Sequence, residues 1–534
     1  MKGRKQLRRR ALRGWSLGIL AVSLMGSAGC GSSPALTPLP PPPPPATSAP
    51  APVSDGPTAW QPTPDAPFRA QAPEPAAERP WTAPVATETK LTNGMRVLYV
   101  SRPTLPIIVV QVVSPRGADQ QPFPGMGSFV GAMLEQGTTT RSAFEISDAY
   151  LDIGANHGAW VDWDSTNVWM QVLPQHLSSG VEVLADVVRN PAFAPNEVDR
   201  VRSQRLASIQ QQADRPRVIV SNTVARSLYA GHAYGESILG DAGSLKRVTS
   251  NGLKALHRAL VVPDETFVVV VGNITQQDVT PILEKAFGSW KGWSPPRRQV
   301  RPPAVQPRKI VVIDRKGASQ SNIAIAGVGV PRTTQDFDAV LMGNTVLGGM
   351  FSSRLNMNLR EKHAFTYGAY SYFDMRHGPG PFMAGAAVDT PNTGPALKEV
   401  LDELERFCTT SVTGQELQLA LGREVKSLPG RFESAGATAG AIADLGVFGL
   451  RLDEFRTRPV RLQGVKPEEV QRTAAAHFNP DHMQIVVAGD VAVIKAQLAA
   501  LAFGPIEIVD AESAKVIERI PVPKPYRSFS CKAP

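Results

Sequence analysis

The side chains that could bind a metal ion are few in this chain, and their spacing does not suit a metal. A zinc helix of the H-x-x-E-H type needs two imidazoles four residues apart on one helical face, with a glutamate between them to activate the bound water. No two of the eight histidines stand four residues apart. They are His157, His176, His232, His257, His363, His377, His477 and His482. Because a catalytic zinc ion takes three protein ligands, the sequence predicts no metal bound by this chain.

Two further residues raise the same question about a metal. His157 follows a Gly-Ala-Asn turn, where a histidine is more often a surface or turn residue than a ligand. Glu135 is an acid without a metal-bound water to activate, and the helical pattern assigns it to the C-terminal turn of a helix. Neither residue is expected to rebuild a metal site.

A second group of reactive side chains lies in the segment 351–368 (FSSRLNMNLREKHAFTYG). Arg360 offers donors in a fixed fork and Tyr367 a polarised hydroxyl, which suits a site where negative charge develops on a carbonyl oxygen. Gly348 allows another backbone to approach closely. An alternative stays open, in which Arg360 belongs to a solvated helix face and Tyr367 to a strand over residues 367–373.

The elements that position these residues follow from hydrophobic periodicity. Short β-branched runs bounded by turn residues predict strands, and apolar residues at helical spacing predict helices. The predicted strands cover residues 92–100, 107–113, 309–314 and 322–326. The predicted helices of the first half cover residues 127–136, 143–153, 176–189 and 195–213.

The chain contains an internal duplication. A Pro-Asp pair at Pro263 precedes a strand that ends at Gly272, and a Pro-Asp pair at Pro480 precedes a strand that ends at Gly489. The offset along the chain from Pro263 to Pro480 is identical to the offset from Gly272 to Gly489. An offset shared by two motifs in the same order indicates repeated units. Each half is predicted to be an α+β unit of helices packed on an antiparallel or mixed sheet.

The 534 residues are enough for several domains. We predict a signal peptide with a lipobox-like end over residues 1–30, a Pro/Ala-rich linker over 31–84, a first homologous domain over 85–292, an interdomain linker over 293–308, a second homologous domain over 309–508 and a C-terminal tail over 509–534. The composition of the first linker cannot bury a core and predicts an extended tether.

The N-terminus has the order of an export signal. The first thirteen residues hold seven lysines and arginines and no acid, an apolar stretch covers residues 15–25, and small residues precede Cys30. This order resembles the bacterial lipobox, in which the signal is cut and the new N-terminal cysteine is acylated, although Ser27 stands where that pattern prefers leucine. A plain signal peptide cut near Ala28 or an uncleaved anchor stays open. We expect export to the bacterial cell envelope and a lipid anchor at Cys30, on the periplasmic side or in the outer membrane.

The charge of the chain argues against a nucleic-acid partner. The net charge is +9, and the seven basic residues of the export signal account for most of it, which leaves +2 (9 − 7). A nucleic-acid-binding protein would need a basic face on its folded part.

The other two cysteines, Cys408 and Cys531, could pair or stay free. Cys408 lies on the apolar face of a predicted helix, which favours a buried free thiol. No disulfide framework is expected from three cysteines.

The segment 125–138 (GMGSFVGAMLEQGT) resembles the zinc helix of the M16 peptidases, the pitrilysin/insulinase/mitochondrial processing peptidase-like family, whose pattern is G-x-(A/S)-H-F-L-E-H-M-x-F-x-G-T. Segments 184–191, 231–235 and 253–274 are similar to further parts of that family, so the resemblance covers residues 88–505. It implies two homologous α+β halves that form a clam-like chamber.

The resemblance also implies which chemistry is missing. Ser128, Gly131 and Ala132 stand where the family has its first histidine, its glutamate and its second histidine. Ser208 stands near the position of the distal carboxylate ligand. With all four zinc-site positions degenerate, the chain is expected to bind no zinc and to be inactive alone.

The segment around residue 360 is similar to the family motif S-R-L-x-x-x-L-R-E-K-x-x-x-x-Y. In active members this arginine and tyrosine reach from the C-terminal half to the zinc half and hold the substrate carbonyl. The motif assigns that substrate-binding role to Arg360 and Tyr367. Some bacterial and mitochondrial members divide the zinc helix and the Arg/Tyr pair between two chains.

Three functions are consistent with these features. The first is the non-catalytic subunit of a two-chain zinc peptidase, in which a zinc-bearing M16 paralogue is the heterodimer partner and a peptide is the substrate. The second is a peptide- or partner-binding envelope scaffold with no hydrolytic role. The third, an autonomous zinc metalloendopeptidase, is disfavoured by the histidine spacing. A neighbouring gene that encodes an intact H-x-x-E-H would separate the first from the second, and zinc content would separate both from the third.

Overall fold

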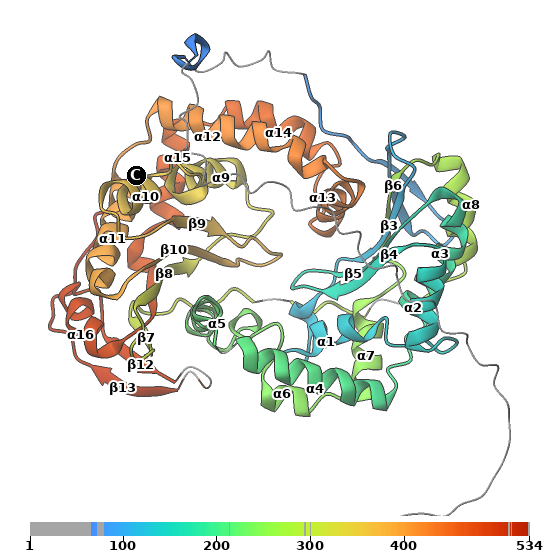
Figure 1. Cartoon of the computed structure of the whole chain (residues 1–534), viewed down its shortest axis with the longest axis horizontal. Coiled ribbons are helices and arrows are strands. Elements are labelled where there is room, and N and C mark those ends of the chain that lie inside the picture. Colours follow the sequence, from blue (N-terminus) through green and yellow to red (C-terminus); the bar gives the residue numbers. More distant parts are fainter. Residues whose placement is uncertain are drawn as a thin grey trace, which may run out of the picture. The chain divides into compact units, whose positions relative to one another are not determined.

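The structure is a computed structural model that describes residues 66–71, 80–212, 214–292, 295–299, 301–510, 513 and 515–531. The chain divides into two compact units, Met1–Glu78 and Arg79–Pro534. In the first unit the described residues form one 3-10 turn, η1 (Pro67–Arg69). The predicted signal peptide, Cys30 and most of the predicted linker lie outside the described residues. Every element described below belongs to the second unit (Figure 1).

The first half is built on a six-stranded mixed sheet with the order β1-β2-β6-β3-β5-β4. Strands β2 and β6 run parallel, and the other neighbours run antiparallel. The strands are β1 (Thr87–Lys90), β2 (Arg96–Ser101), β3 (Ile108–Ser114), β4 (Asn156–Val161), β5 (Thr166–Val172) and β6 (Phe267–Gly272). Every residue of β3 and β6 is buried, as expected for valine-rich strands that are covered on both faces of a sheet.

The helices of the first half agree with the periodicity of the sequence to within a few residues at each end. The capping box of Ser142 and Glu145 marks the start of α2, because it satisfies two backbone N–H groups that the helix leaves unpaired. The helices are α1 (Met126–Met133), α2 (Ala143–Asp152), α3 (Leu177–Arg189), α4 (Pro195–Gln212), α5 (Pro216–Leu228), α6 (Ala242–Lys246), α7 (Ser250–Leu260) and α8 (Gln276–Phe287), with the 3-10 turns η2 (Ala118–Gln120), η3 (Pro174–His176) and η4 (Ala233–Gly235).

The second half is built on a seven-stranded sheet with the order β13-β12-β7-β11-β8-β10-β9. Its strands are β7 (Ile310–Asp314), β8 (Gln320–Val328), β9 (Ala369–Phe373), β10 (Pro381–Asp389), β11 (Met483–Gly489), β12 (Ile506–Val509) and β13 (Val516–Ile520). The run β7-β11-β8-β10-β9 repeats the run β2-β6-β3-β5-β4 of the first sheet, including its one parallel pair. The prediction of two homologous α+β halves is therefore confirmed.

The helical part of the second half contains two stretches of π-helix, η5 (Thr345–Gly349) and η6 (Met357–Lys362). The α-helices are α9 (Phe337–Asn344), α10 (Arg354–Asn356), α11 (Thr393–Thr409), α12 (Gly414–Ser427), α13 (Ala435–Val447), α14 (Glu454–Gln463), α15 (Pro467–His477) and α16 (Val491–Ala500), with the 3-10 turns η7 (Thr390–Asn392), η8 (Pro429–Phe432) and η9 (Pro480–His482). Among the helices of the described residues, none combines the length and the apolar composition that crossing a bilayer requires.

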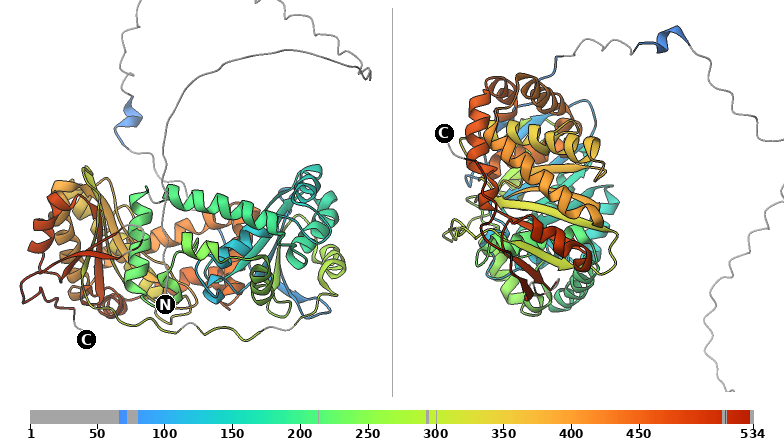
Figure 2. Two further views of the ribbon diagram at one scale, coloured as in Figure 1. Left: turned by 90° about the horizontal axis from the view of Figure 1, so that it is seen from below. Right: turned by 90° about the vertical axis from the view of Figure 1, so that its left-hand side faces the viewer.

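The two halves exchange one helix each. Helix α5 of the first half packs on β8 and β11 of the second sheet, and helix α13 of the second half packs on β3 and β6 of the first sheet (Figures 1 and 2). Gly446 permits this approach of α13, because a Cβ at that position would lie 2.3 Å from the ring of Phe267. The guanidinium of Arg102 donates to the carbonyl oxygens of Phe432 and Glu433 at 2.6 and 2.9 Å. The reciprocal exchange joins the halves through apolar core rather than through surface contacts.

The C-terminal segment folds back over α11 and corrects one expectation. Cys408 and Cys531 form a disulfide with a Cα–Cα distance of 5.1 Å, so the expectation of a free thiol at Cys408 was wrong. The apolar pattern gave the burial of Cys408 correctly, since 3% of the residue is exposed. It could not reveal a partner that lies far along the chain, which Arg527 holds in place through ion pairs with Asp402 and Glu405 at 2.7 and 2.8 Å.

Candidate functional site

Helix α1 carries three of the four positions that the family resemblance assigns to a zinc site. Ser128 and Gly131 are buried and Ala132 is half-buried, and all three lie on a helix whose Phe129, Val130 and Met133 belong to the core of the first half. The helix starts at Gly125, whose φ of 82° is a left-handed conformation that favours glycine. The apolar stripe that supports a helix here is therefore intact, although the metal-binding side chains are absent.

The middle position, Gly131, has no room for a side chain. A Cβ at Gly131 would lie 2.7 Å from the backbone nitrogen of Val161 and 3.0 Å from the carbonyl carbon of Trp160. Both residues belong to β4, the edge strand of the first sheet. The backbone of α1 thus packs directly on the backbone of β4. A glutamate at residue 131 would require the helix and the strand to separate.

The first position, Ser128, is held by an arginine from α4. The guanidinium of Arg205 donates to the Oγ of Ser128 at 3.0 Å and to its carbonyl oxygen at 2.5 Å, and it lies over the ring of Phe129 at 5.1 Å. Burial lowers the pKa of Arg205 to about 10, so the side chain is still charged at neutral pH. Ser208 is half-buried three residues farther along α4. Of the predicted positions, Ser128 is therefore in contact with α4, but through Arg205 rather than Ser208.

The donor set of this region does not fit a zinc ion. A hydroxyl, a hydrogen atom and a methyl group stand at Ser128, Gly131 and Ala132, and the charged group that contacts Ser128 is a guanidinium. Zinc requires imidazole, thiolate or carboxylate ligands. Among the described residues, no group of three or more His, Cys, Asp or Glu side chains is arranged to hold a metal ion.

Glu135 and His157, which the sequence treats as two separate residues, lie side by side. The Nδ1 atom of His157 is 2.6 Å from the Oε1 atom of Glu135. The imidazole stacks on the ring of Tyr150 with a centroid distance of 4.1 Å, and burial, followed by the charge of Glu135, raises the pKa of Tyr150. One imidazole and one carboxylate are fewer than the three ligands of a catalytic zinc. The pair links the end of α1 to β4.

The second group of predicted site residues lies on an exposed part of the second half. Arg360 is in η6, where its guanidinium lies 4.6 Å from the ring centroid of Phe351 and 3.5 Å from a carboxylate oxygen of Glu361. Tyr367 is 93% exposed and precedes β9, which begins at Ala369. The alternative that Tyr367 is a strand residue is therefore wrong.

Local contacts fix the backbone that carries Tyr367. Ala364 adopts a φ of 52°, and the N–H of Phe365 donates to the carbonyl oxygen of Leu359 at 2.8 Å. The ring of Phe365 stacks on His363 with a centroid distance of 5.0 Å. The backbone N–H of Ala369 donates to the amide oxygen of Asn356 at 3.1 Å. The turn is thus held at both ends, while the tyrosine side chain points into solvent.

Arg205 is the residue that sequence reasoning missed in this region. The family motif predicts an acid near Ser208, and residues 205–209 contain none. The basic residue three positions earlier has a side chain long enough to reach α1. The signal available in the sequence was a reversal of charge within one turn of the expected carboxylate.

Comparison with known proteins places these features in one family. A family model described as insulinase (peptidase family M16) matches residues 96–242, and a model described as peptidase M16 inactive domain matches residues 247–422. An uncharacterized zinc protease, YmxG, of Bacillus subtilis is 25% identical over 331 residues, which cover 61% of this chain and 79% of the relative. An uncharacterized zinc protease of Streptomyces coelicolor is 25% identical over 394 residues, which cover 72% and 86%.

Solved structures have the same fold. A crystal structure of a peptidase M16 inactive domain from Pseudomonas fluorescens superimposes with a TM-score of 0.70 and 27% identity, and it covers 76% of this chain and 98% of that one. The first half of the periplasmic protease PqqL from Escherichia coli superimposes with a TM-score of 0.66 and 14% identity, and it covers 78% and 95%. At that lower identity the likeness is one of fold alone.

Proposed function

Because this chain belongs to the peptidase M16 family, we propose that it is the non-catalytic subunit of a two-chain zinc peptidase. In this proposal a zinc-bearing paralogue supplies the metal and the general base, and this chain supplies Arg360 and Tyr367 to bind the peptide carbonyl. The observation that carries the proposal is the contrast between a first-half site that is filled by protein atoms and a second-half pair that faces solvent.

The first half is unsuited to hydrolysis by itself. A metallopeptidase polarises the scissile carbonyl and activates a water at one metal ion, and the residues that would hold that ion are replaced. The contact between Gly131 and β4 and the bonds from Arg205 to Ser128 occupy the space between α1 and its neighbours. Two helices and an edge strand are thereby held together without a metal.

The second half retains donors that a partner could use. Tyr367 is almost wholly exposed, and the Arg360 side chain is 36% exposed beside the exposed ring of Phe351. An exposed Tyr-Arg-Phe group is typical of residues that become buried at an interface. Donors aimed at a developing oxyanion each contribute to the rate of acyl transfer.

The test is reconstitution with a zinc-bearing M16 chain. We expect this chain alone to contain far less than one zinc per molecule and to cleave no peptide, and the mixture to be active. Tyr367→Phe should lower kcat of the mixture by about 10²–10³, as loss of one oxyanion donor does. KM and complex formation should change little, because the hydroxyl acts mainly in the transition state. Arg360→Ala is expected to affect both kcat and KM.

Tyr526→Phe is the matched control, since Tyr526 lies in the C-terminal segment and is part of neither site. Gel filtration verifies assembly of each variant. An assembled, active mixture in which Tyr367→Phe keeps full kcat would contradict the shared-site mechanism. A peptide-binding chain that activates no zinc-bearing partner would support the scaffold function instead.

We further propose that the protein is exported and lipid-anchored in the bacterial envelope. The support is the N-terminal order of basic, apolar and small residues before Cys30, together with the disulfide between Cys408 and Cys531. Disulfides persist in oxidising compartments such as the periplasm and are rare in the cytosol.

Substitution of the proposed acylation site tests the anchor. Cys30→Ala should block lipid attachment and move the protein from the membrane to the soluble fraction, because the acyl chains supply the membrane affinity. Fractionation and mass spectrometry of the N-terminal peptide provide the measurement. A Cys30→Ala protein that stays in membranes after signal cleavage would place the anchor elsewhere.

A further inference from the structure

A cavity on the first half is lined by four basic side chains and by no acid. Its volume is about 490 Å³, and it lies where the C-terminal ends of α3 and α7 meet the segment that follows α8. The basic residues are Arg189, Lys254, Arg258 and Lys291. We propose that this cavity binds a phosphate ester, a ligand site separate from both groups of residues described above.

Within the part of the chain that the structure describes, the four cations lack carboxylate partners. Arg189 donates to the carbonyl oxygen of Ala286 at 2.6 Å and lines both this cavity and the neighbouring one. Lys254, Arg258 and Lys291 form no ion pair with any residue in the described ranges. Outside the export signal the chain has a net charge of only +2 (9 − 7). Four cations around one cavity are therefore a local concentration of charge, not a property of the whole surface.

Helix dipoles do not cancel this charge. The C-terminal ends of α3, α7 and α8 meet near the cavity, and each carries about half a negative charge. Three such ends contribute about −1.5 against the +4 of the side chains. The balance is positive by more than two charges. Arg189 and Arg258 lie in the last turns of α3 and α7, where a cation stabilises the helix end. This role does not account for Lys254 and Lys291.

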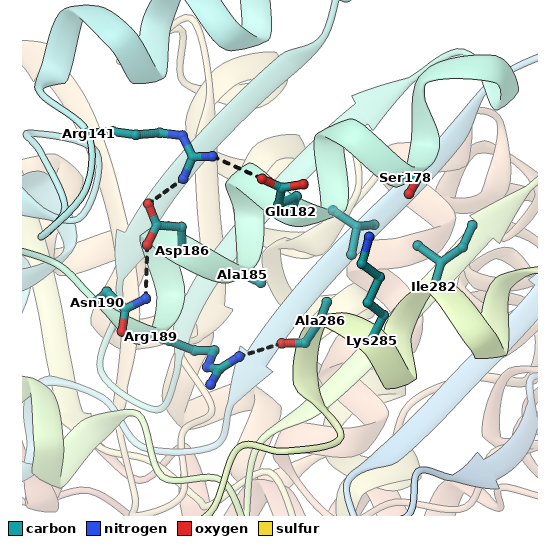
Figure 3. A pocket seen from close by; sticks show the side chains of 11 residues that line it. Arg141, Ser178, Glu182, Ala185, Asp186, Arg189, Asn190, Ile282, Lys285 and Ala286 are labelled. Carbon is teal, nitrogen blue, oxygen red and sulfur yellow. Dashed lines mark hydrogen bonds and ion pairs between the residues drawn. The ribbon is translucent and has the colours of Figure 1, made fainter.

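A neighbouring cavity of about 260 Å³, which shares Arg189 and Asn190 with the basic cavity, shows how these two residues are held (Figure 3). There Arg141 pairs with Asp186 and Glu182 at 2.7 and 3.1 Å, and the side chain of Asn190 donates to Asp186 at 2.9 Å. In that cavity the acids neutralise the arginine. The network also fixes Asn190, which forms part of the wall of the basic cavity.

The remaining walls are mostly apolar. Phe193 is buried and adopts a φ of 49°, which costs free energy for a non-glycine residue and is held by its surroundings. His257 is buried, and burial lowers its pKa to about 4, so the imidazole is neutral at physiological pH. Trp290 adds an aromatic surface. The charge of the cavity therefore comes from the four cations alone.

A phosphate ester matches these features better than a bare carboxylate does. Arginine forks bind phosphate oxygens in pairs, and lysines act as additional point charges. The volume lies in the range of small-molecule sites, so the cavity has space for an organic group beside Trp290. The same chemistry is offered by a soluble phosphate ester and by the headgroup of an anionic phospholipid.

The test uses the mature Cys30→Ala protein, so that its own lipid does not bind the vesicles. Glycerol 3-phosphate is titrated calorimetrically into this protein and into K254Q/R258Q, which removes two exposed cations of the cavity. The matched control K246Q/K316Q removes two exposed lysines elsewhere. We expect the cavity variant to bind at least about tenfold more weakly and the control to stay within about twofold. Circular dichroism verifies that each variant is folded.

Vesicles distinguish the two sources of the phosphate. Binding to phosphatidylglycerol but not phosphatidylcholine vesicles, lost in K254Q/R258Q, identifies a lipid headgroup as a ligand. Saturable binding of glycerol 3-phosphate without vesicle binding identifies a soluble ester. Either result supports the site. The proposal would be overturned if neither glycerol 3-phosphate nor phosphatidylglycerol vesicles bound saturably. It would also be overturned if K246Q/K316Q lost as much binding as K254Q/R258Q.

Discussion

Helix α1 of the first half and helix η5 of the second half have matching positions in the duplication, and both meet an edge strand through a glycine. Gly348 follows Gly131 at the same offset along the chain at which Pro480 follows Pro263. A Cβ at Gly131 would lie 2.7 Å from the backbone of β4, and a Cβ at Gly348 would lie 2.3 Å from the backbone nitrogen of Ser371 in β9. Each edge strand is in contact with helix backbone.

The residues three positions before the two glycines bond to side chains of opposite charge. These residues, Ser128 and Thr345, are also equivalent in the duplication, and each hydroxyl bonds to a charged side chain of a following helix. Ser128 accepts from Arg205 of α4, whereas Thr345 donates to Glu424 of α12 at 2.8 Å. The two halves use the same cross-link with charges of opposite sign.

This comparison shows how α1 is held in place without metal-binding side chains at Ser128, Gly131 and Ala132. In the first half, α1 has the glycine contact of η5 and a hydroxyl-to-helix bond that holds it to α4. Packing and a half-buried guanidinium thus hold α1, α4 and β4 together. The first half resembles the zinc half of the family. Its helix α1 nevertheless packs as η5 does in the second half, which carries no zinc motif.

The strongest test of the comparison is to add one methyl group to each glycine. Gly131→Ala and Gly348→Ala should each lower the free energy of unfolding by about 3 kcal/mol, because the new Cβ meets strand backbone that cannot rotate away. Urea denaturation followed by circular dichroism gives the measurement.

Gly440→Ala in α13 is the control for these two variants. No atom lies within 4 Å of a Cβ built at Gly440, so alanine should stabilise the protein by up to about 1 kcal/mol through its higher helix propensity. If Gly131→Ala proves neutral while Gly348→Ala is costly, β4 can move away from α1, and the equivalence of the two contacts fails.

A smaller effect is expected from removing the two cross-links. Arg205→Met should cost about 2 kcal/mol, since it removes two charge-assisted hydrogen bonds to Ser128, and Thr345→Val about 1 kcal/mol, since it removes one hydroxyl bond to Glu424. Arg200→Met on the same helix is the control. Its ion pair with Glu197 and its hydrogen bond to the side chain of Gln136, just beyond α1, lie on the surface, with 44% of the Arg200 side chain exposed, and together should contribute less than about 0.5 kcal/mol. Equal losses for Arg205 and Arg200 would show that the guanidinium does not secure α1.

The elements of the fold could be predicted from the sequence because their signals are local or periodic. The run of valines in 268–271 indicated a strand, and the constant offset between paired motifs indicated the duplication. The repeated order of strands in the two sheets became visible only in the structure. The exchange of α5 and α13 between the halves could not be predicted. The sequence of a helix indicates that it has an apolar face, but it does not indicate which sheet covers that face.

In the first half, the candidate site could be predicted only as a list of what is missing. The motif located Ser128, Gly131 and Ala132 on one helix, which the structure confirms. The contacts that fill the space come from residues far along the chain, such as Arg205, or from a strand that carries no motif. The pairing of Glu135 with His157 depends on where the end of α1 lies against β4. Such contacts depend on tertiary packing, and no periodic pattern specifies them.

The smallest expected effect concerns two aspartates at equivalent positions with opposite shifts in pKa. Asp336 follows Asp119 at the same offset at which Gly348 follows Gly131. Burial raises the pKa of Asp119 to about 6, with a further contribution from the charge of Asp164. The hydrogen bond from Arg472 lowers the pKa of Asp336, assisted by His477. Duplicated acids are thus predicted to respond to pH in opposite directions.

The sign of each response follows from proton linkage. A carboxyl whose folded pKa is raised binds its proton more tightly in the folded state, so its contribution to stability is lost as the pH rises through about 6. For Asp119 this loss amounts to about 1 kcal/mol between pH 5 and pH 7.5. Asp336 has a lowered pKa, so its contribution is present above its unfolded pKa and is lost as the pH falls below that value.

Unfolding free energies measured from pH 3 to pH 8 separate the two aspartates. Asp119→Asn should flatten the decline of stability between pH 5 and pH 7.5, because asparagine cannot ionise and keeps the shape of the protonated acid. Burial lowers the pKa of His377, but the hydrogen bond with Asp164 and the charge of that residue raise it by more. The contribution of His377 to stability is therefore also lost as the pH rises, and the decline in Asp119→Asn should shrink rather than vanish. Asp336→Asn should leave that window unchanged and lower stability most at neutral pH, where the ion pair with Arg472 is intact. If the stability profile of Asp119→Asn ran parallel to that of the wild type from pH 5 to pH 7.5, Asp119 would ionise normally in the folded protein. Opposite pKa shifts of Asp119 and Asp336 would then be refuted.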